Sequence, residues 1–210
     1  HNCALTREGA AWCWGQNDEG QLGDGTFVIR DRPVPVAGAL RFTAVSAGHA
    51  HSCALVADGT VWCWGDNGRG QLGSGAAGGK SAVPIRVSTD LRFARVVAGY
   101  YQTCGLDTDG RAYCWGQNDE GQIGDGTMEQ RSTPVTVSGD HRFSDLDTGD
   151  RFGGRLRIGQ RFDEVSSMAI RVTSRSCSEP SAKRPLAACD IDRQDRAAGL
   201  HLRARQRMLG

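Results

Sequence analysis

The chain of 210 residues carries 25 Lys and Arg against 24 Asp and Glu, a formal net charge of +1. This near balance gives no indication of a nucleic-acid or membrane-surface partner, and the chain lacks the run of about 18 apolar residues that would predict a membrane-spanning helix. The charges are unevenly placed, because residues 1–150 hold 12 basic and 18 acidic residues whereas residues 151–210 hold 13 and 6. We therefore expect an acidic body followed by a basic tail.

An internal repeat dominates the acidic body. Residues 1–26, 51–76 and 102–127 align, and each reads close to HxCALxxDGxxWCWGxNxxGQLGxG. Equivalent positions in successive copies lie 50 or 51 residues apart. We place the repeat units near residues 1–32, 33–83, 84–133 and 134–152.

Each unit contains four short strand-like runs separated by turns. In one unit the runs are VPIRV (83–87), FARVVAG (93–99), TCGLD (103–107) and AYCWG (112–116). Four strands in a unit of about 50 residues are typical of one blade of a β-propeller, and no window shows the sustained periodicity of an amphipathic helix. The predicted fold is therefore all-β, with two whole four-strand units (33–65 and 84–116) between two half-units (1–15 and 134–149). Because a closed ring needs about four to eight blades, we expect an incomplete arc. Either blades are missing from the chain or another molecule completes the arc, and we interpret the chain as a fragment with blades missing.

The repeat pattern stops after residue 152. RFSDLDTGDRF (142–152) still matches the start of the earlier units, but the residues that follow have no CWG and no GQLG. Residues 153–210 are rich in Arg and contain neither Trp nor Tyr. We expect this divergent tail to be disordered, or to be an out-of-frame reading, and its cysteines, Cys177 and Cys189, have no repeat partner.

Two cysteines flank a turn in every complete copy of the repeat. In HSCALVADGTVWCWG, Gly59 supplies the positive φ of a three-residue hairpin loop, and this register places Cys53 opposite Cys63. The equivalent pairs are Cys3 with Cys13 and Cys104 with Cys114. Directly opposed residues lie close enough for a disulfide, and disulfides would indicate an oxidising compartment, either extracellular or periplasmic. Reduced buried cysteines and a metal site stay open as alternatives, although zinc needs four ligands and each hairpin offers two cysteines.

The other chemically suggestive motifs have plainer interpretations. GQLGDG (20–25) and its copies lack the helix and the Lys-Ser/Thr of a phosphate loop, so they predict turns and close approach between blades. Acidic residues in these loops could gather calcium, but the second copy replaces most of them. Trp14, Trp64 and Trp115 recur at one strand position, which predicts packing between blades. His49 and His51 line up with no repeated nucleophile, so the sequence predicts no enzyme, no cofactor and no metal.

The repeat resembles the regulator-of-chromosome-condensation repeat family over residues 1–150, in the order and spacing of about a dozen positions of the family pattern. The resemblance implies a seven-bladed propeller in members that have seven units. It further implies a non-enzymatic scaffold for protein–protein interaction, and the cysteine pairs favour the secreted or cell-surface bacterial members. The alternative implied by the resemblance is a guanine-nucleotide exchange factor, or another regulator, for a small GTPase.

The loops between the repeated strands are the predicted surface for a protein partner. We expect no nucleic-acid binding, because the arginines of the tail are scattered among acidic residues, and we expect self-association through open blade faces to be possible. The candidate partner-binding residues are Asn17, Asp18, Glu19, Arg30, Arg32, Asn67, Arg69, Lys80, Asn118, Asp119 and Glu120.

Overall fold

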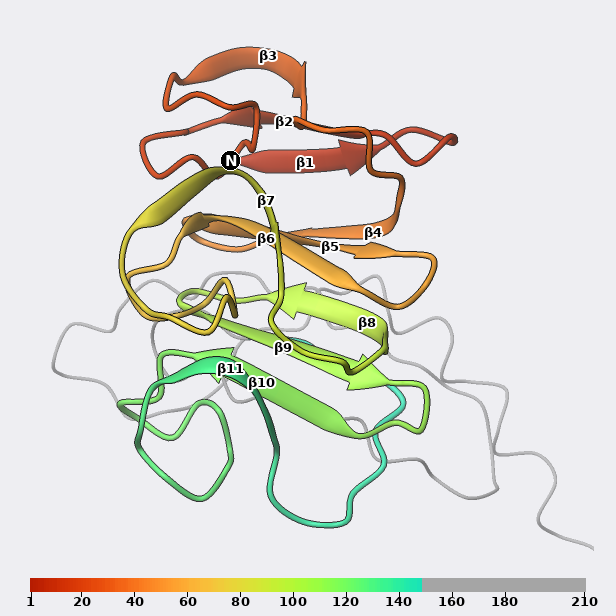
Figure 1. Ribbon diagram of the computed structural model, residues 1–210, viewed down its shortest axis with the longest axis vertical. Helices are drawn as coiled ribbons and strands as arrows, with labels where there is room; N and C mark the ends of the chain where they lie inside the picture. The colour runs from red at the N-terminus through yellow and green to blue at the C-terminus, as the bar shows by residue number, and fades with distance from the viewer. Residues whose placement is uncertain (149–210) are drawn as a thin grey trace, which may run out of the picture. The chain divides into compact units, whose positions relative to one another are not determined.

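The computed structural model describes residues 1–148, and these form three antiparallel β-sheets arranged one after another (Figure 1). Blade one is the sheet β1–β2–β3, with β1 (Asn2–Leu5), β2 (Ala11–Gly15) and β3 (Arg30–Pro35). Blade two contains β4 (Phe42–Ala47), β5 (His51–Val56), β6 (Val61–Asp66) and β7 (Lys80–Arg86). Blade three contains β8 (Phe93–Ala98), β9 (Gln102–Asp107), β10 (Ala112–Gly116) and β11 (Arg131–Thr136). The predicted all-β class with four-stranded blades is confirmed.

The predicted grouping of strands into blades is wrong by one strand. The run at 83–87 was expected to share a sheet with the three runs that follow it, but β7 instead pairs with β6, through Cys63↔Ile85 and Gly65↔Ser81. The physical reason is that the chain, after the long loop between β6 and β7, returns to the open edge of the sheet it has just left. Blades two and three therefore begin at Phe42 and Phe93, and each ends on the Pro-containing strand of the next sequence unit.

The outermost strand of every blade contains proline. β3 contains Pro33 and Pro35, β7 contains Pro84, and β11 contains Pro134. Proline cannot donate a ladder hydrogen bond, so it suits an edge strand and discourages a further strand from adding there. The outer edges of the blades are thus poor sites for accidental strand pairing.

The hydrophobic core lies between successive blades. In one cluster Cys13 and Leu22 of blade one pack with Phe42 and Trp64 of blade two. In the next cluster Cys53, Cys63 and Leu72 of blade two pack with Phe93, Tyr113 and Trp115 of blade three. Each blade therefore turns its cysteine face toward the following blade and its tryptophan face toward the preceding one.

A segment beyond β11 continues this arrangement. Phe143 and Leu146, with 8% and 1% of their surface exposed, pack on Cys104, Cys114 and Ile123 of blade three. They occupy the positions that Phe42 and Val45 hold in β4, so residues 143–148 follow the pattern of the first strand of a further blade. The predicted tail 153–210, with Cys177 and Cys189, lies outside the described residues, and its predicted boundary at residue 152 stays a prediction.

Candidate functional site

The hairpins hold the cysteine pairs in the predicted register. Cys53 lies opposite Cys63 in the β5–β6 ladder, the Val56 N–H donates to the Thr60 carbonyl at 2.9 Å, and Gly59 has φ of 82°. Disulfides join Cys3 to Cys13, Cys53 to Cys63 and Cys104 to Cys114, each with a Cα–Cα distance of 4.1 Å. The structure therefore uses these residues as cross-strand links rather than as thiols or metal ligands.

The tryptophans bind the loop of the preceding blade. The Trp64 indole N–H donates to the Gln21 carbonyl at 2.8 Å, and the Trp115 indole donates to the Gln71 carbonyl at 2.9 Å. Both indoles are fully buried. A Cβ at Gly23 would lie 2.8 Å from the Trp64 ring, so only glycine allows this approach. The GQLG motif thus serves packing between blades, as predicted from the sequence.

The buried histidine belongs to the same inter-blade contact. The Thr103 hydroxyl donates to the Gln71 carbonyl at 2.8 Å, so it accepts from His51 Nε2 at 2.9 Å. Complete burial, assisted by the charge of His49, lowers the pKa of His51 to about 3. His51 is therefore a neutral structural residue. His49 is exposed and stacks on Tyr100 with ring centroids 4.0 Å apart.

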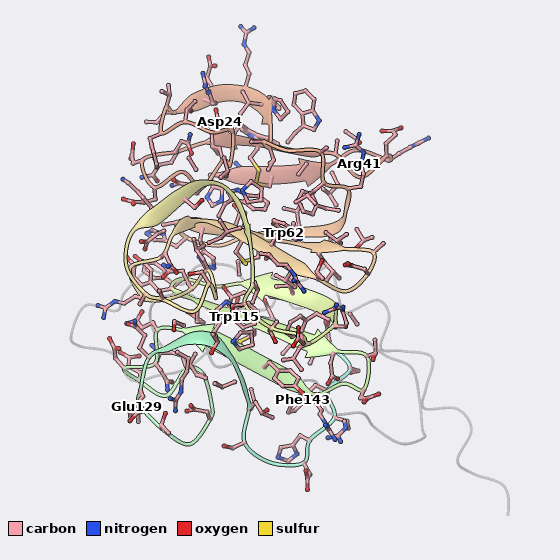
Figure 2. The ribbon with its side chains drawn as sticks, in the orientation of Figure 1. Asp24, Arg41, Trp62, Trp115, Glu129 and Phe143 are labelled. Atoms are coloured by element: carbon pink, nitrogen blue, oxygen red, sulfur yellow. A yellow bond between two sulfur atoms is a disulfide. The ribbon has the colours of Figure 1, made fainter. Side chains whose placement is uncertain are left out.

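Three long loops lie at one end of the sheets, and we call residues 16–30, 66–80 and 117–131 the loop face. Glu129 lies on this side, whereas Arg41 lies at the opposite end (Figure 2). Each loop is organised by a single asparagine: Asn17 Oδ1 accepts from the Leu22 N–H at 3.0 Å, and its Nδ2 donates to the Thr26 and Val28 carbonyls, each at 3.0 Å. The loops are therefore built platforms rather than loose connections.

The sequence prediction was wrong for the three asparagines. Asn17 and Asn118 are fully buried and Asn67 is 5% exposed. Asn67 and Asn118 repeat the contacts of Asn17, because their amides bond backbone within their own loops. These amides hold the loops in shape and are not presented to a partner. Their role could not be read from composition, since asparagine is also common in exposed turns and loops.

An ion pair closes two of the three loops. Asp24 accepts from the Arg30 guanidinium at 2.9 Å, and Asp125 accepts from Arg131 at 2.7 Å. Burial alone raises the pKa of Asp125, but hydrogen bonds from Thr127 and Arg131 outweigh it and lower the pKa to about 2. Arg30, a predicted partner-binding residue, is thus engaged within its own loop. Within residues 1–148, no group of three or more His, Cys, Asp or Glu could hold a metal ion.

The charged loop residues also link neighbouring blades. Lys80 lies 3.5 Å from Glu19 and donates to the Asp18 carbonyl at 2.8 Å, and Arg69 lies 3.8 Å from Asp119. All five of these residues were predicted for partner binding. The structure brings Asp18, Glu19 and Lys80 together at one blade junction, and Arg69 and Asp119 at the next. The ion pairs are exposed and contribute little stability. Glu120 and, on β3, Arg32 are exposed to solvent.

Exposed apolar side chains on the loop face were missed by the sequence prediction. Phe27, Val28 and Ile29 expose 47%, 56% and 61% of their surface, and Met128 exposes 66% at the matching place in the third loop. Lys80 lies over the Phe27 ring, 4.9 Å from its centroid. The sequence did contain a signal for this group. The first loop has the apolar run TFVI after GDG, whereas the second loop has only AAGG at the same place.

Two hollows are lined by residues that the structure describes. One, of about 300 Å³, lies at the end of the sheets opposite the loop face and is lined by Arg111, Tyr113, His141 and Arg142. The other, of about 550 Å³, is lined by Ser74 of the loop face together with Arg86 and Asp90. Neither lining combines a nucleophile with a hydrogen-bonded base. Among residues 1–148 no helix is long and apolar enough to cross a membrane.

Repeated four-stranded blades that pack a tryptophan hairpin on the preceding loop define a β-propeller repeat protein. The chain belongs to the regulator of chromosome condensation (RCC1) repeat family, whose model matches residues 8–55, 58–106 and 109–153.

A human and a plant protein share sequence similarity with this chain. The human E3 ubiquitin-protein ligase HERC2 is 33% identical over 144 residues, covering 66% of this chain and 3% of HERC2. The Arabidopsis thaliana ultraviolet-B receptor UVR8 is 32% identical over 212 aligned positions, covering 90% of this chain and 47% of the receptor.

Solved structures show the same fold. Prp20p from Saccharomyces cerevisiae, studied for its binding to Gsp1p and histones, superposes with a TM-score of 0.62 at 22% identity, over 73% of this chain and 40% of that one. Human WBSCR16 gives a TM-score of 0.53 at 18% identity, over 70% and 53%. The chain thus spans less than two thirds of each of these relatives.

Proposed function

We propose that this chain is a non-enzymatic β-propeller scaffold that binds a protein partner through its loop face. The observation that carries the proposal is the exposed apolar group Phe27, Val28 and Ile29, held on a loop that the hydrogen bonds of the buried Asn17 amide fix in shape. Exposed apolar groups rimmed by polar residues mark interaction sites. A preorganised loop also loses little conformational entropy when it binds.

The charge of the loop face favours a basic partner. Residues 16–30, 66–80 and 117–131 contain eight acidic residues and four basic ones. The turns at the other end (6–10, 37–41, 57–60, 86–92, 108–111 and 138–142) contain five acidic residues and six arginines. A basic protein would therefore be steered to the loop face. Core histones are a suitable probe, because they are basic and because the similarly folded Prp20p was studied with them.

Binding of core histones to the full chain tests this proposal. The loop-face variant Asp119→Asn/Glu120→Gln should weaken binding by about fivefold, since each exposed charge contributes about 0.5 kcal/mol. The matched control Glu8→Gln/Asp109→Asn removes two acids from the opposite end and should leave the affinity unchanged. Equal loss in both variants, or no measurable binding by the wild type, would contradict the proposal.

Regulation of a small GTPase is the second candidate, favoured by the fold shared with Prp20p, which binds Gsp1p. Release of fluorescent GDP from a purified small GTPase, measured with and without this chain, distinguishes the two. Accelerated release would support an exchange factor, whereas an unchanged rate together with histone binding supports the scaffold.

We further infer an oxidising location, extracellular, periplasmic or at a cell surface, from the three cross-strand disulfides. A non-reducing peptide map of natively purified protein should link Cys53 to Cys63, whereas free thiols there would rule the location out. The expected bacterial source stays a prediction, because the relatives reported above are human and plant proteins.

A further inference from the structure

The second loop of the loop face contains an asparagine followed by a glycine, Asn67–Gly68, and no other Asn–Gly dipeptide occurs in the 210 residues. The equivalent asparagines, Asn17 and Asn118, are each followed by an aspartate. Asparagine is chemically labile, because the backbone nitrogen of the next residue can attack its side-chain amide. A following glycine has no Cβ to crowd that nitrogen, whereas an aspartate does. Asn67 is therefore the most reactive of the three loop asparagines by sequence.

The reaction of an Asn–Gly pair exchanges ammonia for water. The Gly68 nitrogen forms a bond to Cγ of Asn67, the Cγ–Nδ2 bond breaks, and ammonia leaves with the proton of the Gly68 N–H. Water then opens the succinimide ring at either carbonyl, adding hydroxyl to the carbon and a proton to the nitrogen. The product is an aspartate or an isoaspartate at position 67, and no oxidant or reductant takes part.

The folded loop opposes this reaction at the side-chain amide. Asn67 is 5% exposed, and its Oδ1 accepts from the Leu72 N–H at 3.1 Å. Its Nδ2 donates to the Ala76 carbonyl at 2.9 Å and to the Gly78 carbonyl at 3.2 Å. Attack would make Cγ tetrahedral and expel Nδ2, so these hydrogen bonds must open first.

The attacking nitrogen is held as well. The Gly68 N–H donates to Oδ1 of Asp66 at 2.8 Å, and Oδ2 of the same carboxylate accepts from the Gln71 side chain at 2.8 Å. The nitrogen attacks after losing its proton, and a neighbouring negative charge disfavours that loss. The first and third loops have glutamine, Gln16 and Gln117, in place of Asp66. The carboxylate thus occurs in the one loop whose asparagine precedes glycine.

We propose that Asn67–Gly68 is a deamidation site that the folded loop keeps closed and that opening of the loop makes reactive. The modification is irreversible and prevents the loop from re-forming. An aspartate at position 67 cannot donate to the Ala76 and Gly78 carbonyls, and it would bury a negative charge against these two acceptors. An isoaspartate would in addition lengthen the main chain by one carbon atom.

The consequence reaches the junction between blades two and three. Leu72 of this loop packs with Trp115, and the Trp115 indole donates to the Gln71 carbonyl. A loop that cannot re-form leaves this indole without its acceptor. The site therefore converts a transient opening of blade two into a permanent loss of the contact.

Peptide mass spectrometry of the full chain, kept in mildly alkaline buffer with and without urea, is the first test. In urea, position 67 should exchange NH2 for OH sooner than Asn17 or Asn118. Without urea the rate at position 67 should be at least about 100-fold lower, because each of the three hydrogen bonds of the Asn67 amide contributes about fivefold to keeping the loop closed. Equal rates with and without urea, or equal rates at all three asparagines in urea, would overturn the proposal.

The variant Asp66→Ala tests the hold on the attacking nitrogen. Loss of the charged acceptor of the Gly68 N–H should raise the rate at position 67 roughly tenfold in the folded chain and leave the rate in urea unchanged. An unchanged rate in the folded chain would contradict the role assigned to Asp66.

Refolding is the second test, and Asp66→Gln/Gly68→Asp is its matched control. This pair gives the second loop the Gln-Asn-Asp sequence of the other two loops. Gly68 is not among the glycines at positive φ, and Gln16 donates to Asp18 at 3.1 Å in the first loop, so the control sequence suits the fold. After equal exposure to urea and return to native buffer, the wild type should lose folded fraction, measured by circular dichroism, in step with modification at position 67. The control should keep its folded fraction.

Equal loss of folded fraction in the wild type and the control, or a wild type that refolds fully after modification at position 67, would overturn the proposal. No partner enters these measurements, so the deamidation site and the scaffold function can fail separately.

Discussion

Replacement of Trp64 by alanine should remove the main contact between blades one and two. The side chain is fully buried, packs with Leu22 and Phe42, and donates one hydrogen bond to the Gln21 carbonyl. Truncating a buried tryptophan typically lowers the free energy of unfolding by about 3–5 kcal/mol. The Gln21 carbonyl still accepts a hydrogen bond from the Ser52 hydroxyl in this variant. Loss of the indole hydrogen bond therefore accounts for only about 1 kcal/mol of the expected decrease.

Urea unfolding followed by circular dichroism measures the effect, and Trp62→Ala is the matched control. Trp62 lies two residues earlier on β6, is half-buried, and its indole donates no hydrogen bond within residues 1–148. We expect its replacement to lower the free energy of unfolding by about 1–2 kcal/mol, in proportion to the smaller buried area. If Trp64→Ala is no more destabilising than Trp62→Ala, the inter-blade role assigned to the recurrent tryptophan is wrong.

Three further predictions concern the same framework. Gly73→Ala should lower the free energy of unfolding by about 2–3 kcal/mol, because a Cβ there would lie 2.8 Å from a buried indole. The control Gly78→Ala, also at positive φ but with open space around it, should lower it by only about 1 kcal/mol. Equal losses of stability in urea unfolding would contradict this. The pair Cys53→Ala/Cys63→Ala should lower the free energy of unfolding by about 2–3 kcal/mol through loss of the cross-link, and a variant as stable as the wild type under non-reducing conditions would show that the link is not formed. Burial lowers the pKa of His51 to about 3 from 6.5, so below about pH 6.5 the unfolded chain binds a proton that the folded chain does not. The free energy of unfolding should therefore fall by about 2–3 kcal/mol from pH 7 to pH 4 because of this group. The variant His51→Gln, which introduces the residue found at the equivalent position of the third repeat unit, should lack that part of the pH dependence.

The repeat made much of the fold predictable. Strand positions, the turn at Gly59 and the opposition of Cys53 and Cys63 follow from local alternation and from hairpin geometry, which depend on neighbouring residues only. The blade boundary did not follow, because the partner of β7 is fixed by which sheet edge the chain meets after a long loop. Nothing within the strand itself distinguishes the edge of β6 from that of β8.

The candidate site was less predictable than the fold. Asn17 was assigned to a partner surface, but its amide is the centre of the loop, since donors and acceptors up to eleven residues away converge on it. Conversely, Phe27 was not among the predicted partner-binding residues, although it is 47% exposed on the loop face. Burial of a loop side chain depends on the path of the whole loop, which the order of residues in a single unit does not reveal.

Hydrogen–deuterium exchange of the full chain, with and without core histones, tests the proposed binding surface most directly. The account predicts added protection in residues 16–30 and 117–131, with no change in the turns 37–41 and 108–111. Protection confined to those turns, or spread evenly over both ends of the blades, would contradict it.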